Sequence, residues 1–410
     1  MTRFSSLEPH AQGSSPSAAR PIEQSVLSDE VTTDRLARID GFLAHAAPQT
    51  PFLVLDLDIV RAQYQALRAW FPFADIYYAV KANPSTEVIG ALADLAASFD
   101  LASSGELERC RKSNIPADRL SFGNTIKREA DIVQASASGI SLFALDSTAE
   151  LEKLARAAPG ARVFCRIAVD SRGALWPLTH KFGCDAEMAG GLLLRAKVLG
   201  LRPAGVSFHV GSQQTDPSQW TRPIEHAARI FRTCARAGVE LELLNLGGGL
   251  PARYRAAVPT LATYARTIEG ALAASFGSSR PRIIIEPGRY LVGDAGVLRA
   301  QVLLVARKSQ SASKRWVYLD AGRYNGLTET LGERIQYRLR TPSDHQACGP
   351  VILAGPTCDS TDVIYEKSTY QLPLDLEIGD PIDFLSAGAY TASYASVEFN
   401  GFAPIRSYAI

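Results

Sequence analysis

Lys81 is the residue of this chain whose position most clearly suggests covalent chemistry. It follows the apolar run from Ile76 to Val80, within the stretch YYAVKANPS. A buried ammonium group has a lowered pKa, which would make Lys81 a nucleophilic amine able to form a Schiff base with an aldehyde. The alternative is a lysine whose stem covers apolar surface while its charge reaches solvent.

Other polar residues and glycines also stand at or just past the ends of apolar runs. They are Asp100, Arg166, His209, Ser212, Gly247, Gly248, Gly249, Glu286, Gly288 and Arg289. Pyridoxal phosphate is the common aldehyde cofactor that uses such a lysine, together with an acidic partner for its ring nitrogen and a cradle for its phosphate. The set contains a candidate for each of these parts.

The glycines at 247–249 let backbone N–H groups approach a phosphate closely, and Arg289 can pair with phosphate oxygens through two hydrogen bonds. Glu286 is a candidate partner for the nitrogen of the cofactor ring, and His209 could lie flat against the face of that ring. Each has a structural alternative. Glycine clusters mostly form turns, a histidine after a strand is usually a hydrogen-bonded structural residue, and Glu286 could pair with Arg289. Their joint position favours a cofactor site.

Eight apolar, β-like runs alternate with helical patterns along the chain. The runs cover residues 76–80, 98–102, 120–123, 141–145, 162–169, 204–210, 241–247 and 282–288. Several of the helical patterns open with Ser or Thr and an acidic first turn. This alternation predicts an α/β fold, a closed (β/α)8 TIM-type barrel, with an open doubly wound sheet as the alternative. In such a barrel the polar residues would meet at the carboxyl end of the strands.

The composition and hydrophobic pattern along the chain predict five segments. Residues 1–32, rich in Ser, Pro and Ala, are expected to be a flexible tail. Residues 33–48 read as an amphipathic helix, and 49–60 contain a strand that joins the second domain. The barrel is expected over 61–292, and short strands broken by Gly, Pro and Asp over 293–410 predict an antiparallel, all-β domain.

Composition excludes several classes of protein. The 410 residues carry 43 basic and 42 acidic side chains, a net charge of +1, which argues against a nucleic-acid partner. No apolar run is long enough to span a membrane. Six scattered cysteines, without metal-site spacing, predict reduced thiols and a cytoplasmic protein with no bound metal: Cys110, Cys165, Cys184, Cys234, Cys348 and Cys358.

Seven ordered motifs resemble one family. They are YAVKANP, SFDLASSGELE, FHVGSQ, NLGGGLP, EPGRYLVG, AGPTCDSTDV and GAYTASYASVEFNGF. From about Pro51 to Ile410 the chain resembles the fold-type III pyridoxal-phosphate-dependent decarboxylases, most of all the bacterial ornithine/lysine decarboxylases. The resemblance implies an alanine-racemase-like barrel with a C-terminal β-barrel or sandwich domain. It also implies cofactor contacts from Lys81, Asp100, Glu106, Arg166, His209, Ser212, Gly249, Glu286, Gly288, Arg289 and Tyr390, with Tyr390 also near the substrate.

The resemblance further implies a head-to-tail homodimer with shared active sites. Cys358 would enter the partner's pocket and protonate the substrate's α carbon, although a small buried hydrophobe is the commonest use of cysteine. Asp359 and Asp320 would bind the distal ammonium group of the substrate, with a strand-end cap as the alternative for Asp320. Lys181 and Asp362 match an inter-subunit salt bridge.

The function predicted in this way is decarboxylation of ornithine, lysine or both, giving putrescine or cadaverine in polyamine biosynthesis. Diaminopimelate decarboxylases usually carry SGGEL and a CESGD-type turn, where this chain has SSGEL and CDSTD. That rival, or a decarboxylase of a specialised diamino acid, remains open. Alanine racemase-like chemistry would not need Cys358 with Asp359. A catalytically inactive regulatory homologue would be marked by loss of residues that are intact here.

The loop that follows Asp320, AGRYNGLTETLGE, is expected to measure the length of the substrate side chain. Ornithine and lysine differ by one methylene, which a pocket distinguishes by only about 1–3 kcal/mol. Arg323 would be unfavourable beside a cationic substrate, so we expect it to face solvent. An inward Arg323 would instead favour substrates with a carboxylate or a modified side chain.

Overall fold

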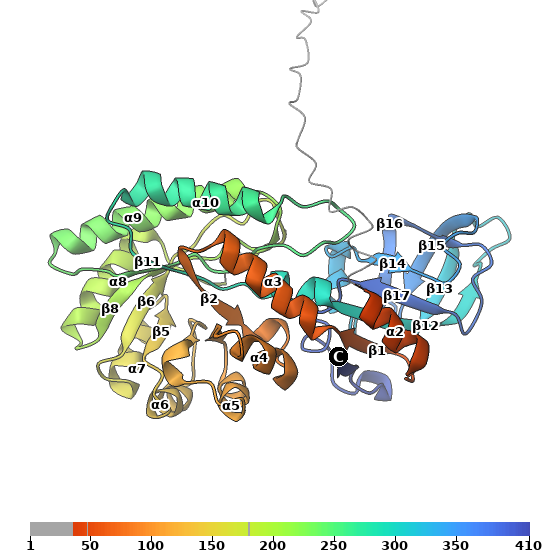
Figure 1. The fold of residues 1–410 in the computed structure, drawn as a ribbon, viewed down its shortest axis with the longest axis horizontal. Helices are drawn as coiled ribbons and strands as arrows, with labels where there is room; N and C mark the ends of the chain where they lie inside the picture. The colour runs from red at the N-terminus through yellow and green to blue at the C-terminus, as the bar shows by residue number, and fades with distance from the viewer. Residues whose placement is uncertain (1–35, 47, 179–180) are drawn as a thin grey trace, which may run out of the picture.

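The computed structural model describes residues 36–46, 48–178 and 181–410. The predicted tail, 1–32, and the first part of the predicted helix at 33–48 lie outside the described residues. Figure 1 shows two lobes side by side: a barrel surrounded by helices, and a smaller lobe rich in strands. Helix α2 (Ala37–His45) packs on the second lobe, where it buries Ile39 and Leu43 against β1 (Phe52–Leu55).

The first lobe is a closed barrel of eight parallel strands in the order β10-β11-β2-β3-β4-β5-β6-β8. This confirms the predicted barrel and excludes the open sheet. The strands are β2 (Ala74–Ala79), β3 (Ser98–Leu101), β4 (Leu120–Phe122), β5 (Leu142–Leu145), β6 (Arg162–Arg166), β8 (Arg202–Ser207), β10 (Leu243–Asn245) and β11 (Arg282–Ile285). The helices of this lobe are α3 (Leu57–Trp70), α4 (Thr86–Ala93), α5 (Ser104–Lys112), α6 (Glu129–Ala137), α7 (Thr148–Ala157), α8 (Ala186–Val198), α9 (Thr221–Arg236), α10 (Leu261–Phe276) and α11 (Arg289–Val292).

Local sequence explains how each strand passes into its helix. Ser85, Ser103 and Ser147 stand at the N-caps of α4, α5 and α7, where each side chain accepts a main-chain N–H of the first turn. Such caps satisfy N–H groups that have no partner within the helix. They also fix short loops at the carboxyl ends of the strands, which is where the polar residues of the sequence stand.

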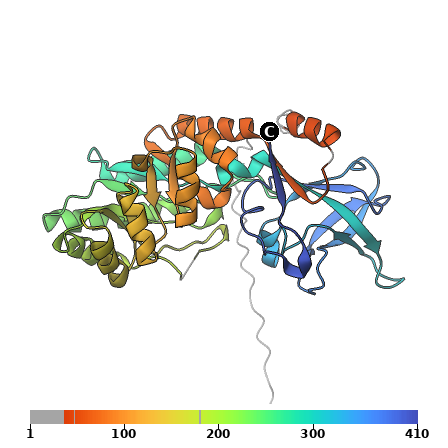
Figure 2. The same ribbon diagram turned by 90° about the horizontal axis from the view of Figure 1, so that it is seen from below.

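The second lobe is a mixed sheet in the order β14-β17-β12-β13-β15-β16, with β1 paired to β12 and β18 paired to β1. Its strands are β12 (Gly296–Ala306), β13 (Arg315–Leu319), β14 (Arg338–Arg340), β15 (Cys348–Ala354), β16 (Val363–Pro373), β17 (Pro381–Leu385) and β18 (Arg406–Ala409). The all-antiparallel prediction is therefore wrong in two places, because β13 pairs in parallel with β15, and β1 with β18. Figure 2 shows the C-terminal strand on the side of the second lobe that faces the barrel.

A long crossover makes the β13–β15 pair possible, since parallel strands cannot be joined by a tight hairpin. Residues 320–347 form this crossover and include the 3-10 helix η5 (Thr328–Glu333) and strand β14. The chain thereby leaves the sheet and returns to it, and η5 reaches the barrel on the way.

The two lobes meet through closely packed backbone. The Asn83 side chain donates a hydrogen bond to the Gly388 carbonyl over 3.0 Å, and the Tyr390 N–H donates to the Ala82 carbonyl over 2.8 Å. A Cβ on Gly388 would lie 1.8 Å from the carbonyl oxygen of Val292. The loop after β17 is therefore fixed against the segment that carries Lys81.

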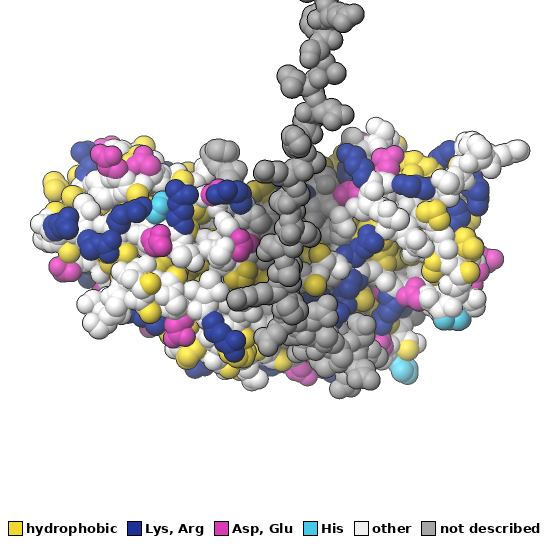
Figure 3. All heavy atoms as spheres, turned by 90° about the horizontal axis from the view of Figure 1, so that it is seen from above, with side chains coloured by type: hydrophobic (Ala, Val, Ile, Leu, Met, Phe, Trp, Pro, Cys, Tyr) yellow, Lys and Arg dark blue, Asp and Glu magenta, His cyan; other side chains and the backbone are white. Residues whose placement is uncertain are grey.

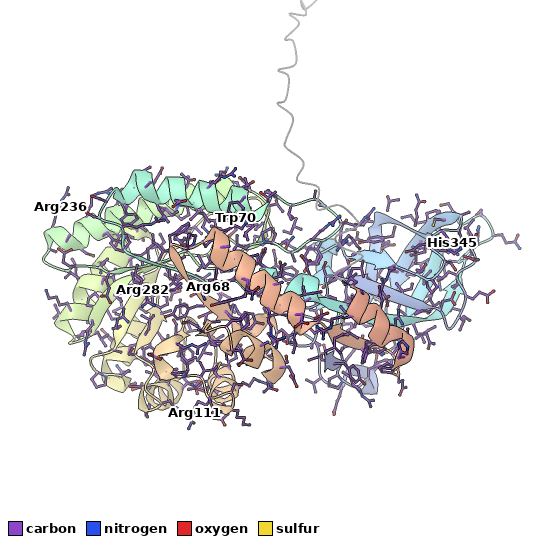
Figure 4. All side chains as sticks on the ribbon, in the orientation of Figure 1. Arg68, Trp70, Arg111, Arg236, Arg282 and His345 are labelled. Carbon is purple, nitrogen blue, oxygen red and sulfur yellow. The ribbon has the colours of Figure 1, made fainter. Side chains whose placement is uncertain are left out.

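Charges of both signs are spread over the face drawn in Figure 3, on both lobes. The side chains labelled in Figure 4, among them Arg111, Arg236 and His345, lie on the outside of the molecule, away from the junction of the lobes. Within the described ranges, no helix combines the length and the apolar character needed to cross a membrane.

Replacing Gly388 with alanine tests the close contact of the lobes. We expect Gly388→Ala to lower the free energy of unfolding by about 1–3 kcal/mol, because the new methyl group must displace backbone. The matched control is Gly191→Ala in α8, where no atom lies within 4 Å of the new Cβ. That change should raise stability by about 0.5–1 kcal/mol. A thermal midpoint of Gly388→Ala equal to that of the wild type would contradict the described contact.

Candidate active site

A pocket at the carboxyl end of the barrel brings together most of the residues predicted to act there. Its lining comprises Ala79, Lys81, His209, Ser212, Gly248, Gly249, Leu250, Glu286, Gly288, Arg289 and Tyr390. Tyr390 comes from the loop after β17, so both lobes contribute to the wall. Among the described residues, no group of three or more His, Cys, Asp or Glu side chains is placed to hold a metal ion.

Lys81 lies in the 3-10 turn η1 (Val80–Ala82) directly after β2, and its Nζ is 3.0 Å from Asp100 Oδ2. Its side chain is 42% exposed, whereas the Asp100 side chain is buried. The expectation of a lowered pKa is wrong. Burial does act to lower the pKa of Lys81, but Asp100, Tyr390 and Glu286 outweigh it and raise the pKa. Lys81 is therefore an ammonium group held by a carboxylate.

Glu286, just past β11, accepts a hydrogen bond from the Asn245 side chain at the end of β10. Burial and the neighbouring charge of Asp100 raise the pKa of Glu286 to about 7, although Lys81, Asn245 and Arg166 oppose the shift. A carboxyl group with this pKa can hold or release a proton near neutral pH. Its place in the pocket wall suits a hydrogen bond to an aromatic nitrogen.

His209 presents an uncharged ring to the pocket. Its Nδ1 accepts the main-chain N–H of Gly211 over 3.0 Å, which places the proton of the neutral ring on Nε2. Burial lowers the pKa of His209 well below its usual value, and the nearby charges of Arg166 and Lys81 lower it further. The imidazole thus remains neutral at physiological pH and offers a flat surface.

Three glycines form a cradle in which a side chain has no room. A Cβ would lie 2.6 Å from the Glu286 carbonyl oxygen at Gly248, and 2.8 Å from the Ala82 Cβ at Gly288. At Gly249, where φ is +114°, a Cβ would lie 2.7 Å from the Gly211 carbonyl oxygen. Backbone can therefore approach a ligand closely here, as an anion site requires.

Arg289 stands beside this cradle. Its guanidinium donates to the Ser212 hydroxyl from Nε, over 3.3 Å, and from Nη2, over 3.1 Å. The guanidinium also lies over the Tyr390 ring, 4.9 Å from its centroid. The alternative that Glu286 pairs with Arg289 is not what the structure shows, because the carboxylate partner of Arg289 is Glu329 in η5. Sequence reasoning missed Glu329, since nothing in TETLGE marks it.

Arg166 and Glu106 do not line the pocket, but their charges act on residues that do: Arg166 on His209 and Glu286, and Glu106 on Lys81. The Arg166 guanidinium stacks on the Phe182 ring, 5.0 Å from its centroid, and burial lowers its pKa. Glu106 accepts the Ala102 main-chain N–H over 2.6 Å, and burial raises the pKa of Glu106. Asp100 Oδ1 is buried and has no hydrogen bond within the described part of the chain.

Cys358 and Asp359 are not among the residues that line this pocket. They lie on the turn between β15 and β16, where Cys358 is exposed. Asn400 Oδ1 accepts from the Cys358 N–H over 3.1 Å and lies 3.4 Å from its Sγ. Asp359 accepts two hydrogen bonds from Thr361, which lower the pKa of its carboxyl. The sequence motif FNGF contained Asn400 but suggested no role for it.

The loop predicted to measure substrate length lies against the same turn. Arg323 Nη1 donates to the Thr361 carbonyl over 2.7 Å, and the Tyr324 hydroxyl lies 3.0 Å from Thr361 Oγ1. The Tyr324 ring also packs on Phe399, with centroids 4.6 Å apart. Arg323 is half-buried and does not line the pocket, so it is neither directed at the substrate pocket of its own chain nor free in solvent. Its hydrogen bonds hold it against the turn that carries Cys358.

Two further acidic residues are engaged within their own chain. The Asp320 carboxylate accepts the Gln301 main-chain N–H over 2.7 Å, which corresponds to the strand-end alternative. Asp362 is buried and accepts from the N–H groups of Arg323 and Thr357. Substrate binding by Asp320, and the pairing of Asp362 with Lys181 of a second subunit, remain predictions.

Comparison with known proteins places these features in a family. Residues 57–293 match the model "Pyridoxal-dependent decarboxylase, pyridoxal binding domain". The chain is 33% identical to the lysine/ornithine decarboxylase of Selenomonas ruminantium, over 86% of this chain and 88% of that protein. It is 34% identical to antizyme inhibitor 2 of Xenopus laevis, over 90% of this chain and 83% of that protein.

Two crystal structures of lysine/ornithine decarboxylase from Vibrio vulnificus are also similar. One is complexed with putrescine, with a TM-score of 0.81, and one with cadaverine, with a TM-score of 0.82. Both are 32% identical to this chain and cover 94% of it, and the match covers 99% and 100% of the respective structures.

The raised pKa of Glu286 predicts a pH-dependent stability of the cofactor-free protein. The pKa of Glu286 in the folded protein, about 7, lies above the ordinary value of 4.5. The contribution of Glu286 to the free energy of unfolding is therefore fully present below about pH 4.5 and is lost as the pH rises through about 7. Glu286→Gln removes this dependence. The thermal midpoint of the variant minus that of the wild type should therefore rise from about pH 5 to about pH 8. A difference that does not change with pH would contradict the assignment.

Proposed function

The chain belongs to the pyridoxal-dependent decarboxylases, and we propose that its reaction is the loss of carbon dioxide from ornithine, lysine or both. The product would be putrescine or cadaverine, released into polyamine biosynthesis. The observation that carries the proposal is the Lys81 ammonium, 3.0 Å from Asp100, in a pocket shared with Glu286 and a neutral His209. This combination suits a cofactor that needs an amine, an acid at its ring nitrogen and a flat neighbour.

The residues of the pocket fit pyridoxal phosphate. Gly248, Gly249 and Gly288 have no room for a side chain, so at these positions only backbone lines the pocket, and Ser212 and Arg289 supply donors for a phosphate there. Lys81 would hold the aldehyde carbon. When bound, the cofactor supplies an electron sink for the charge left on the α carbon after carbon dioxide departs.

The protein's own groups would manage the protons. Glu286, with a pKa of about 7, would share a proton with the ring nitrogen. His209 would pack against the ring without adding charge, because its pKa is depressed. Asp100 would hold the Lys81 amine in place. Tyr390 would close the pocket from the second lobe, where its backbone N–H is fixed to the Ala82 carbonyl.

The remaining groups would come from a second copy of the chain. Cys358 would donate a proton to the α carbon, with Asn400 fixing the direction of its sulfur. Asp359 would bind the distal ammonium group, and its lowered pKa keeps it charged. Both residues lie outside the pocket of their own chain, which supports a head-to-tail homodimer with shared sites.

Apolar side chains beside the Cys358 turn support the same dimer. Four of them, in the segment that contains Asn400, are 36–77% exposed in the single chain: Tyr394, Val397, Phe399 and Phe402. An exposed apolar group of this kind is typical of a surface covered by a partner. The six free cysteines, four of them buried, support a cytoplasmic location.

One observation favours a second candidate substrate. Arg323 is held against the turn that carries Asp359 instead of pointing to solvent. A guanidinium near the distal end of the substrate would suit diaminopimelate or another specialised diamino acid with a carboxylate there. The similarity to antizyme inhibitor 2 points to a regulatory role instead, yet Lys81, Cys358 and the phosphate-side residues are all present, which supports catalysis.

Amine formation by the cofactor-loaded protein tests the proposal directly. We would offer ornithine, lysine, arginine and diaminopimelate in parallel and separate the products by chromatography. Putrescine or cadaverine should form, and Lys81→Ala should abolish both, because the cofactor anchor is lost. The preference between ornithine and lysine should lie within roughly 10–200-fold. Bound cofactor without amine from either substrate would rule out the proposed reaction, and lysine from diaminopimelate would select the second candidate.

Mixing two inactive variants tests the shared site. Lys81→Ala and Cys358→Ala should each be inactive or nearly so alone. After dissociation and random reassociation, half of the dimers contain one intact site, so activity should return to about a quarter of the wild-type value. Cys348→Ala, which changes another exposed cysteine, is the control and should keep full activity. No recovery from a verified mixed dimer would show that Cys358 serves its own chain or neither.

A further inference from the structure

Arg289 and Glu329 form a buried ion pair between the two lobes. Arg289 begins α11 next to the barrel, and Glu329 lies in η5 of the crossover. Nη2 is 2.6 Å from Oε1 and Nη1 is 2.7 Å from Oε2, which is the two-pronged arrangement preferred by arginine and carboxylate. The side chains are only 3% and 6% exposed.

Every N–H of the Arg289 guanidinium has an acceptor in the protein. Arginine offers five such donors. Two bond to Glu329, two to the Ser212 hydroxyl, and the last to the Tyr254 hydroxyl over 2.7 Å. Of these acceptors only Ser212 also lines the pocket. An anion in the pocket would therefore accept hydrogen bonds from the Nε and Nη2 edge of the guanidinium, which faces Ser212. The ion pair with Glu329 would stay in place.

The charge of Arg289 needs this carboxylate. Burial acts to lower the pKa of Arg289, but Glu329 and Tyr254 outweigh burial, and the net shift is well above the usual value. Within the described residues, Glu329 is the one carboxylate in an ion pair with Arg289. An unpaired buried charge is strongly destabilising, whereas a pair with good geometry is tolerated.

We propose that Glu329 is a positioning residue that also serves as the standing counter-ion of Arg289. It holds the guanidinium edge toward the pocket and neutralises its charge whenever no phosphate group is bound. The inference rests on the proposed function, which assigns the cofactor phosphate to Arg289. Two consequences follow. The cofactor-free protein stays stable, and phosphate binds less tightly than it would to an uncompensated arginine.

Glu329→Gln tests this by removing the charge and keeping the shape. The thermal midpoint of the full-length variant is measured without ligand, with inorganic phosphate, and with pyridoxal phosphate. Without ligand it should fall by roughly 5–10 °C. With pyridoxal phosphate it should fall much less, because the phosphate then supplies the missing negative charge. Inorganic phosphate should bind the variant at least about tenfold more tightly than the wild type.

Glu333→Gln is the matched control. Glu333 belongs to the same η5 segment and also uses its carboxylate fully, accepting the N–H groups of Glu366, Lys367 and Ser368. It has no contact with Arg289 among the hydrogen bonds and ion pairs of the described chain. This variant should lose the same stability with and without phosphate, and its affinity for phosphate should be that of the wild type.

A double variant, Arg289→Met with Glu329→Gln, separates loss of charge balance from loss of shape if the single variant folds poorly. Without ligand it should be more stable than Glu329→Gln alone, since no buried charge is left unpaired. The inference is overturned if the double variant is no more stable, or if Glu329→Gln loses equal stability in all three conditions. A wild-type protein that pyridoxal phosphate does not stabilise would instead refute the proposed function.

Discussion

The structure depends on the balance of charges in the partly buried pocket at the carboxyl end of the barrel. The Lys81 ammonium and the Arg289 guanidinium both lie where water cannot solvate them fully, and each is held by a carboxylate, Asp100 or Glu329. Removing one member of such a pair costs far more than the pair contributes, because the other charge is left without a partner. η1 carries the first of these pairs and η5 the carboxylate of the second, so both segments bring opposite charges together at the pocket.

The same balance sets the protonation of the other pocket residues. Glu286 has a raised pKa because it is buried beside Asp100, and His209 a lowered one because it is buried beside two cations. Because the pKa of Glu286 is raised and that of His209 is lowered, Glu286 can carry a proton near neutral pH while His209 stays uncharged. Lys81 shows that the sign of such a shift depends on the sum of its neighbours, since burial alone would have moved its pKa the other way.

Much of this architecture could be predicted from the sequence. Each barrel strand carries its own apolar run and several helices begin with recognisable caps, so local sequence signals were enough to predict the closed barrel. The rule that active sites lie at the carboxyl ends of barrel strands then predicted that Lys81, His209, Glu286 and Arg289 lie close together. Pairing partners were not predictable, because Glu329 and Asn400 meet Arg289 and Cys358 through the tertiary fold alone. The parallel β13–β15 pair was missed for the same reason, since strand direction depends on the crossover and not on the strands themselves.

The crossover between β13 and β15 contacts both the turn that carries Cys358 and the pocket residue Arg289. Tyr324, near its start, touches the turn that carries Cys358, and Glu329, five positions later, grips Arg289 in the pocket of its own chain. In the proposed dimer with shared sites, the first contact would serve one reaction centre and the second would serve the other. The loop would then connect the two centres. A substitution in this loop that changed the substrate preference would then also alter the residues proposed to hold the cofactor, which would limit how specificity can evolve in this chain.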